Sequence, residues 1–162
     1  SYVVMWQGDF TVVTQAGQPI FWTRWPFYIL SCTLLMVEIG QVKGIRGGSL
    51  VQILWLTGLV MLAGTLAARD LSDIRWVYYA LSSVAYILLV IRVLPSPTAG
   101  SRWINPYIYF GWTAFPLVFI LEPTGLAVIG AALANLLYLL LDIYTKIIFN
   151  IQIERYSRRR AR

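Results

Sequence analysis

An acid and an amine stand four residues apart near the end of the chain. Asp142 and Lys146 are the only charged residues in the otherwise apolar run from Leu139 to Phe149. Residues four apart on a helix share one face, so we expect the two side chains to stack one turn apart. Ionisable groups are costly in hydrocarbon and mark functional sites by default. A buried lysine amine also forms Schiff bases with carbonyl compounds, because burial favours its neutral, nucleophilic form.

The spacing of Asp142 and Lys146 alone leaves two interpretations open. The plain one is a structural ion pair that joins neighbouring helices. The other is a ligand site, favoured by aromatic residues that share one face of an expected helix with a proline: Trp112, Phe115, Pro116 and Phe119. Pro116 lacks a backbone N–H and should kink that helix. A kinked aromatic wall opposite a buried lysine suits a long, flat, apolar ligand.

The composition indicates a membrane protein. Of the 162 residues, 59% are hydrophobic and only 12% are charged, whereas a soluble domain carries roughly 25% charged residues. Several uncharged stretches approach or exceed the roughly 20 residues that a helix needs to cross a bilayer. We therefore expect an all-α, polytopic transmembrane bundle whose short connections make its neighbouring helices antiparallel. The five expected spans are residues 22–40, 49–68, 74–94, 103–121 and 125–151.

The lysines and arginines predict an orientation in the membrane. Most of them fall on one side, which by the positive-inside rule is the cytoplasmic side, so the C-terminus should be cytoplasmic. The basic tail, residues 155–162, suits a topology anchor beside anionic lipid or, alternatively, a docking site for a partner. The connections expected outside are those near residues 9–19, 69–73 and 122–125.

Local patterns add two smaller expectations. The polar connection 7–19 contains the β-prone run Phe10–Val13 and a turn-forming glycine, Gly17, which together predict a short hairpin. Cys32 is the only cysteine and there is no histidine. We therefore expect neither an intrachain disulfide nor a metal site.

The motifs described above resemble those of the microbial (type I) rhodopsin family. In that family the last helix carries an aspartate four residues before the lysine that binds retinal, as Asp142 and Lys146 stand here. Its sixth helix carries the motif Trp-x-x-aromatic-Pro-x-x-aromatic, which residues 112–119 meet. Three earlier helices of the family are also matched: the third by residues 19–25 with Arg24, the fourth by Thr57 and Gly64, and the fifth by residues 75–83.

The resemblance runs from the end of the family's helix two through helix seven, so five of seven helices are expected in the chain. Residues 1–154 would form the retinal-binding transmembrane domain, followed by the basic cytoplasmic tail. On this interpretation helix one and most of helix two precede Ser1, which would not be a natural start. The apolar stub Tyr2–Trp6 would then be the end of helix two.

The resemblance implies roles for individual residues. Lys146 would carry retinal as a protonated Schiff base, Asp142 would be its counterion, and Arg24 would tune the field around them. No enzyme activity, metal or nucleic acid is implied. The expected partners are the lipid bilayer, further copies of the chain in a homo-oligomer, and a fused or docked effector or channel domain. The other residues placed around the chromophore are Phe27, Tyr28, Ser31, Cys32, Tyr79, Ser82, Tyr86, Trp112, Phe115, Pro116 and Phe119.

Departures from the family pattern bear on the output. Phe27 stands where proton-pumping relatives carry the carboxylate that takes the Schiff-base proton, and a phenyl ring accepts no proton. We therefore expect sensory signalling or light-gated ion conductance rather than pumping. Cys32 stands where channel-type relatives often carry cysteine, although free cysteine is also a common small core residue. Glu38 stands where pumps keep the cytoplasmic proton donor, and it supports the alternative of a light-driven pump with an altered counterion.

Two alternatives concern the remaining ionisable groups. Glu122, near the external mouth, is either a proton-release group or, as we expect, a loop carboxylate exposed to water. A transporter could also use Asp142 and Lys146 as an ion-coupled pair without any chromophore.

Overall fold

A computed structural model describes residues 12–13, 19–20, 24–95 and 99–160. The expected stub Tyr2–Trp6 lies outside these residues. The first three long helices are α2 (Arg24–Lys43), α3 (Gly47–Arg69) and α4 (Ile74–Val93). The next span combines η1 (Ala99–Ile104), η2 (Tyr107–Trp112) and α5 (Thr113–Leu121), and the last combines α6 (Ala131–Asp142), η3 (Ile143–Ile148) and α7 (Phe149–Arg160).

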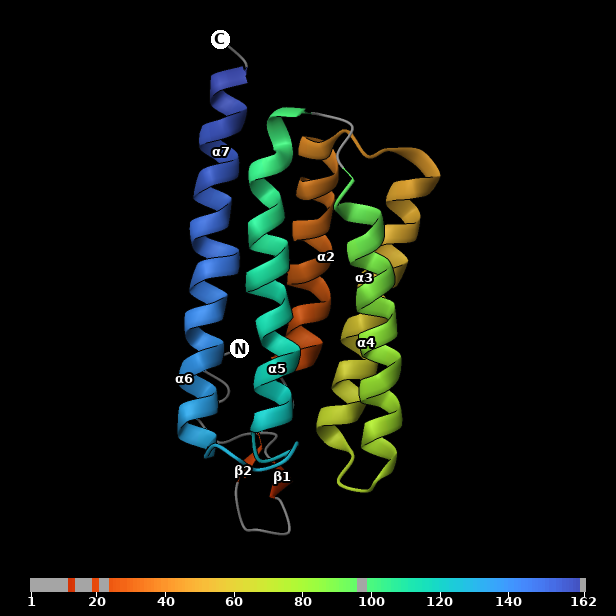
Figure 1. The fold of residues 1–162 in the computed structure, drawn as a ribbon, viewed down its shortest axis with the longest axis vertical. Helices are drawn as coiled ribbons and strands as arrows, with labels where there is room; N and C mark the ends of the chain where they lie inside the picture. Colours follow the sequence, from red (N-terminus) through yellow and green to blue (C-terminus); the bar gives the residue numbers. More distant parts are fainter. Residues whose placement is uncertain (1–11, 14–18, 21–23, 96–98, 161–162) are drawn as a thin grey trace.

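Five helices in the described part of the chain are long and apolar enough to cross a membrane, which confirms the expected all-α transmembrane bundle. They stand side by side, with α2 and α5 between α6–α7 on one side and α3–α4 on the other (Figure 1). Successive spans run in opposite directions, and the C-terminus lies at the end of the bundle where α2 ends and α3 begins. We call this the C-terminal end and the opposite one the loop end.

The start of the last span was predicted too early, at residue 125 instead of Ala131. The chain after α5 folds back on itself first: Leu126 N–H donates to Ile120 O at 2.7 Å, and Ile129 N–H donates to Leu121 O at 2.9 Å. Ala127 has a φ of 55°, in the left-handed region that a helix does not use. The turn therefore occupies residues that hydropathy alone assigned to the span.

The expected hairpin before the first span is present in the described residues. β1 (Val12–Val13) pairs with β2 (Pro19–Ile20) in antiparallel register, with Val12 opposite Ile20. The two strands lie at the loop end, below α5 and α6 in Figure 1.

The helix register is irregular in the two spans that carry the expected ligand residues. η2 and η3 are both π-helical, and they contact each other. Pro116 lies inside α5 and cannot bond the carbonyl of Trp112, the residue at which η2 ends. A Cβ on Gly111 would lie 2.5 Å from Thr145 Cγ2, so the two spans approach closely only because residue 111 has no side chain.

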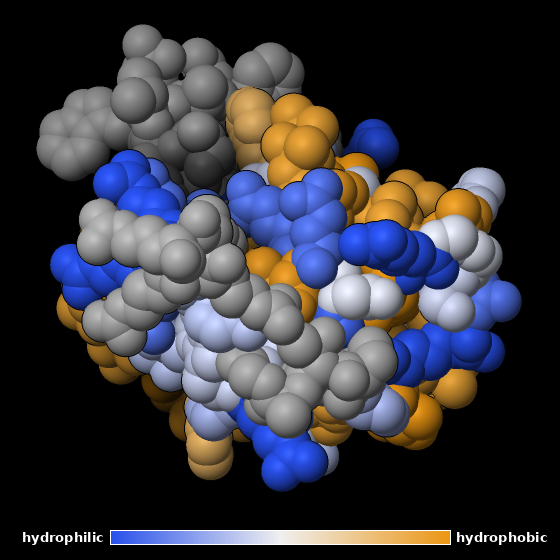
Figure 2. All heavy atoms as spheres, turned by 90° about the horizontal axis from the view of Figure 1, so that it is seen from above, coloured by the Kyte–Doolittle hydropathy of each residue, from blue (hydrophilic) through white to orange (hydrophobic). Residues whose placement is uncertain are grey.

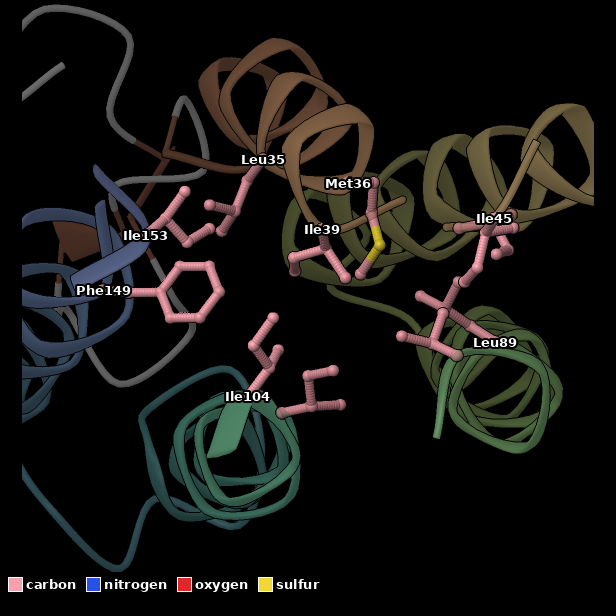
Figure 3. Packing of buried hydrophobic residues seen from close by; sticks show 11 residues of the cluster. Leu35, Met36, Ile39, Ile45, Leu89, Ile104, Phe149 and Ile153 are labelled. Carbon is pink, nitrogen blue, oxygen red and sulfur yellow. The ribbon is translucent and has the colours of Figure 1, made fainter. Parts of the chain in front are cut away.

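Buried apolar residues form two clusters, one toward each end of the bundle. Toward the C-terminal end the cluster joins α2, α4, η1 and α7, with Leu35, Met36 and Ile39 facing Ile104 and Phe149 (Figure 3). Toward the loop end the second cluster is mainly aromatic: Trp25, Tyr28, Phe119 and Tyr138. Seen from the C-terminal end, hydrophilic and hydrophobic side chains are mixed on this face (Figure 2), and large hydrophobic side chains such as Leu30, Val77 and Leu133 are exposed along the helices. This distribution fits helices whose flanks meet lipid.

Candidate functional site

Asp142 and Lys146 form an ion pair in the last span, with Oδ1 of Asp142 2.7 Å from Nζ of Lys146. Asp142 is the last residue of α6 and Lys146 lies in η3, so the two face each other across the transition to the π-helical segment. Asp142 is 8% exposed. The stacking expected from the four-residue spacing is therefore confirmed, within a largely buried setting.

A tyrosine from α2 completes the arrangement. The hydroxyl of Tyr28 donates to Asp142 Oδ2 at 2.7 Å, and Nζ of Lys146 lies 3.6 Å from the centre of the Tyr28 ring. The hydrogen bond fixes the carboxylate, while the ring face attracts the positive charge of the amine. Tyr28 thus contacts both members of the pair and joins the last span to α2.

Beside Lys146 lies a pocket that runs between α2, α3, α4 and the last two spans. Counting its open mouth and the solvent there, it encloses about 790 Å³ of empty space. Its walls are predominantly apolar and aromatic. The residues expected around a chromophore that do line it are Tyr28, Cys32, Tyr79, Ser82, Tyr86, Trp112, Phe115, Pro116, Phe119 and Lys146.

The polar groups in the pocket wall bond to protein atoms. Ser82 Oγ donates to Val60 O at 2.9 Å, and the Tyr86 hydroxyl lies 2.8 Å from Thr113 Oγ1. The Tyr79 ring stacks on Phe119 with centroids 5.3 Å apart and 9° between the planes. Because these groups are already bonded, the wall presents mainly carbon to a ligand, and the amine of Lys146 is the reactive group that borders it.

Other predicted site residues lie outside the pocket lining. Phe27 is 49% exposed, and Ser31 Oγ donates to the Phe27 carbonyl at 3.2 Å, on a different face of α2 from Tyr28. Glu38 is exposed on the half of α2 nearer the C-terminal end. Their proposed parts in chromophore binding or proton relay remain predictions.

Arg24 and Glu122 belong to a second polar group, at the loop end. Arg24 is buried, donates to Asn135 Oδ1 at 2.6 Å and lies 4.2 Å above the centre of the Tyr138 ring. Glu122 is only 8% exposed and accepts a 2.6 Å hydrogen bond from Thr124 Oγ1. Burial raises the pKa of Glu122 from 4.5 to about 7, although Thr124 and Arg24 act in the opposite direction. The expectation of a water-exposed carboxylate was therefore wrong, because the turn after α5 covers it.

Sequence reasoning missed part of the pocket wall. Trp25 lines it and makes edge-to-face contacts with Tyr28 and Phe119, at centroid distances of 5.9 Å and 5.8 Å. Its helical spacing could have revealed it, since Trp25 lies three residues before Tyr28 on the buried face of α2. Gly64 of α3 makes room for it: a Cβ there would lie 3.2 Å from the indole.

Comparison with known proteins gives concordant results. The model of the family described as "Bacteriorhodopsin-like protein" matches residues 1–157. Among solved structures, that of schizorhodopsin 4 shares 36% identity and superposes with a TM-score of 0.88, covering 93% of this chain and 75% of that one. A light-driven proton pump from Leptosphaeria maculans superposes with a TM-score of 0.85 at 20% identity, covering 98% of this chain and 76% of that one, a likeness of fold alone.

Curated relatives include proteins named as bacteriorhodopsins and as sensory rhodopsins. A Bacteriorhodopsin-II-like protein of Haloquadratum walsbyi is 30% identical over 80% of this chain and 58% of its own length. Sensory rhodopsin-1 of Halobacterium salinarum is 24% identical over 91% of this chain and 65% of its own length. The chain thus spans less than two thirds of the length of these relatives. Its helices, its acid–amine pair and these matches together show that the chain is a multi-pass membrane protein of the bacteriorhodopsin-like family.

Proposed function

We propose that this chain is the retinal-binding part of a light-responsive membrane protein. Nζ of Lys146 would hold retinal as a Schiff base, formed with its aldehyde by loss of water, and Asp142 would be the counterion. The observation that carries this proposal is the amine of Lys146 at the border of an aromatic pocket, with its acid partner 2.7 Å away. A lysine placed there has both a charge partner and space for an apolar ligand.

The residues present fit retinal by their chemistry. The ligand would need an amine at one end and a long apolar channel with flat walls, which Trp112, Phe115 and Tyr79 help to supply. The lining is mostly carbon, and its hydroxyls are bonded to protein atoms. When bound, retinal supplies a light-driven isomerisation next to the nitrogen of Lys146.

The chain's own residues then have defined tasks. Asp142 holds the positive charge and the proton on Nζ of Lys146, and Tyr28 holds Asp142 in place through its hydroxyl. Trp25 and Phe119 exclude water from the side of the pocket toward the loop end. When Nζ turns away from Asp142, the ion pair weakens and the proton on Nζ becomes easier to lose.

The arrangement of acids supports a direction for that proton. Position 27 holds a phenyl ring, and Asp142 is already bonded to Tyr28 and Lys146. Glu38 is the carboxylate of α2, and it lies between the level of Lys146 and the C-terminal end. It is therefore the proton acceptor that we propose. The output that we propose is proton transfer toward the C-terminal end. With the C-terminus in the cytoplasm, as the positive charges predict, this transfer carries protons into the cell.

A second candidate output is signalling or light-gated ion conductance, as the sequence analysis expects. The observation that favours it is Cys32, which lines the pocket one turn from Tyr28. The lipid bilayer surrounds the bundle, and oligomerisation and a docked effector remain proposals for the longer protein.

Two measurements test these statements. The full chain incubated with all-trans retinal should develop a visible absorption band, and a colourless protein would favour the ion-coupled transporter without chromophore. In cells in unbuffered medium, illumination should raise the external pH, and Glu38→Gln should abolish the signal while Glu154→Gln leaves it. A current that reverses with voltage would instead support conductance, and acidification would overturn the inward direction.

A further inference from the structure

The chain has a second lysine, which is fully buried and which the proposed function does not use. Lys43 is the last residue of α2 and has no exposed surface. Its Nζ donates to Val93 O at 2.7 Å, to Leu94 O at 3.3 Å and to Asn105 Oδ1 at 2.6 Å. An ammonium group has three N–H donors, so these three oxygens match its full donor capacity.

The oxygens come from two other spans. Val93 and Leu94 form the C-terminal end of α4, where helix carbonyls lack partners within the helix and the helix dipole favours a cation. Asn105 lies between η1 and η2, and its Nδ2 donates to Leu94 O at 3.4 Å. Lys43 therefore joins the ends of α2 and α4 to the beginning of the fourth span.

This joint is continuous with the apolar cluster of the C-terminal end. Val93 and Ile104, which flank the oxygens bound to Lys43, are both fully buried members of that cluster. Figure 3 shows Ile39 of the same cluster on the side of Ile104, and Leu89 beside Ile45. Any separation of these helices would take these oxygens away from the buried ammonium, which is unfavourable until water replaces them.

The helices that Lys43 joins also line the pocket, further along their length. α2 brings Tyr28 and Cys32 to the pocket, and the fourth span brings Trp112 and Phe115. If a rearrangement of the pocket moves α2 away from the fourth span, one of two things must follow. Either these two helices bend, or their ends separate at Lys43. Packed helices transmit such displacements because their interfaces hold discrete arrangements.

We propose that Lys43 is a latch, a positioning residue whose bonds to α4 and Asn105 hold the C-terminal end closed and set the rate at which light opens it. This proposal rests on the proposed retinal-binding function. Opening then requires the ammonium to exchange its protein oxygens for water. The closed latch keeps that end of the bundle dry until the pocket has rearranged.

The test compares time constants of flash-induced absorbance changes in the retinal-loaded full chain. Lys43→Met keeps an unbranched side chain, one atom shorter than that of lysine, and removes the donors. It should leave the visible band in place and accelerate the slowest phase before recovery by about tenfold, the effect of losing hydrogen bonds of a charged group. Asn105→Ala removes one acceptor and should accelerate the same phase by roughly threefold. Arg46→Gln, an exposed cation three residues away, is the matched control and should leave the phase unchanged.

The outcomes separate the two proposals. If Lys43→Met and Asn105→Ala lower the melting temperature in the dark but leave every time constant within about twofold of wild type, Lys43 is only structural and the latch is refuted. An equal acceleration in Arg46→Gln would also refute it, since loss of any nearby charge would then suffice. If Lys43→Met does not assemble, Asn105→Ala decides alone. A wild-type chain that forms no pigment overturns the proposed function, and the latch with it.

Discussion

The two lysines of this chain differ in what surrounds their amines. Lys146 has a carboxylate at 2.7 Å, an aromatic ring beneath it and a pocket beside it. Lys43 is more deeply buried, yet its amine is enclosed by three neutral oxygens. The difference teaches that burial alone does not make a lysine reactive. Schiff-base formation needs open space for the ligand beside the amine, and a nearby acid stabilises the protonated product. A lysine whose donors all bind protein oxygens has a structural role instead.

Replacing each lysine gives the largest expected contrast. Lys146→Ala should abolish the visible absorption band completely, because no other amine borders the described pocket. Lys43→Met should retain the band, since its amine contacts only helix-end oxygens and Asn105 in the bonds described. Absorption spectra after incubation with retinal provide the measurement. Equal loss of the band in both variants would break the distinction between the two lysines.

Glu122 extends the comparison to a buried acid. Its folded-state pKa of about 7 lies above the ordinary 4.5, so the folded protein binds more protons than the unfolded chain between these values. Stability should therefore fall as pH rises from about 5 to 7, by on the order of 2 kcal/mol. Glu122→Gln should remove this dependence, because a neutral amide keeps the acceptor for Thr124.

Thermal unfolding in the dark as a function of pH measures the Glu122 effect. The matched control is Glu154→Gln, which alters an exposed carboxylate paired with Arg158 at 2.5 Å. The control should follow the wild-type pH profile. A wild-type profile that is flat from pH 5 to pH 7 would show that Glu122 is not buried in its neutral form.

Tyr28→Phe sharpens the comparison at the acid partner of Lys146. The variant keeps the ring beneath the amine and removes the hydroxyl that donates to Asp142. A hydrogen bond to a charged group contributes about 1.5–3 kcal/mol, so the free energy of unfolding should drop by about 2 kcal/mol. Tyr86→Phe, which removes a bond to the neutral Thr113, should lose only about 1 kcal/mol. Equal losses in the two variants would indicate that Asp142 carries no charge.

Gly111→Ala gives the smallest expected effect and disturbs only the wall next to Lys146. The added methyl would lie 2.5 Å from Thr145 Cγ2 and 3.2 Å from the Tyr144 ring, so η2 and η3 must move apart. We expect a loss of about 1 kcal/mol, because overpacking outweighs the gain in helix propensity. Gly58→Ala, with nothing within 4 Å of the new Cβ, should be neutral or stabilising. If the absorption maximum shifts in Gly111→Ala but not in Gly58→Ala, the contact between residue 111 and Thr145 lies beside the chromophore.

The sequence predicted the features that depend on local order. Membrane-length apolar stretches gave four of the spans to within a few residues, and helical spacing placed Asp142 against Lys146. It missed the features that depend on chain reversal. The turn after α5 buries Glu122 and delays α6 through bonds such as Leu126 N–H to Ile120 O, and no hydropathy pattern encodes such bonds. The burial of Lys43 could not be predicted from local patterns, because its acceptors lie 50 residues or more along the chain.

The central claim is a covalent bond between retinal and Nζ of Lys146, and its location can be read directly. The retinal-loaded full chain would be reduced with borohydride, digested and analysed by mass spectrometry. We predict the mass of a reduced retinyl group on the peptide that contains Lys146 and none on the peptide that contains Lys43. Retinyl on Lys43, or no adduct on any lysine of a coloured protein, would contradict the account.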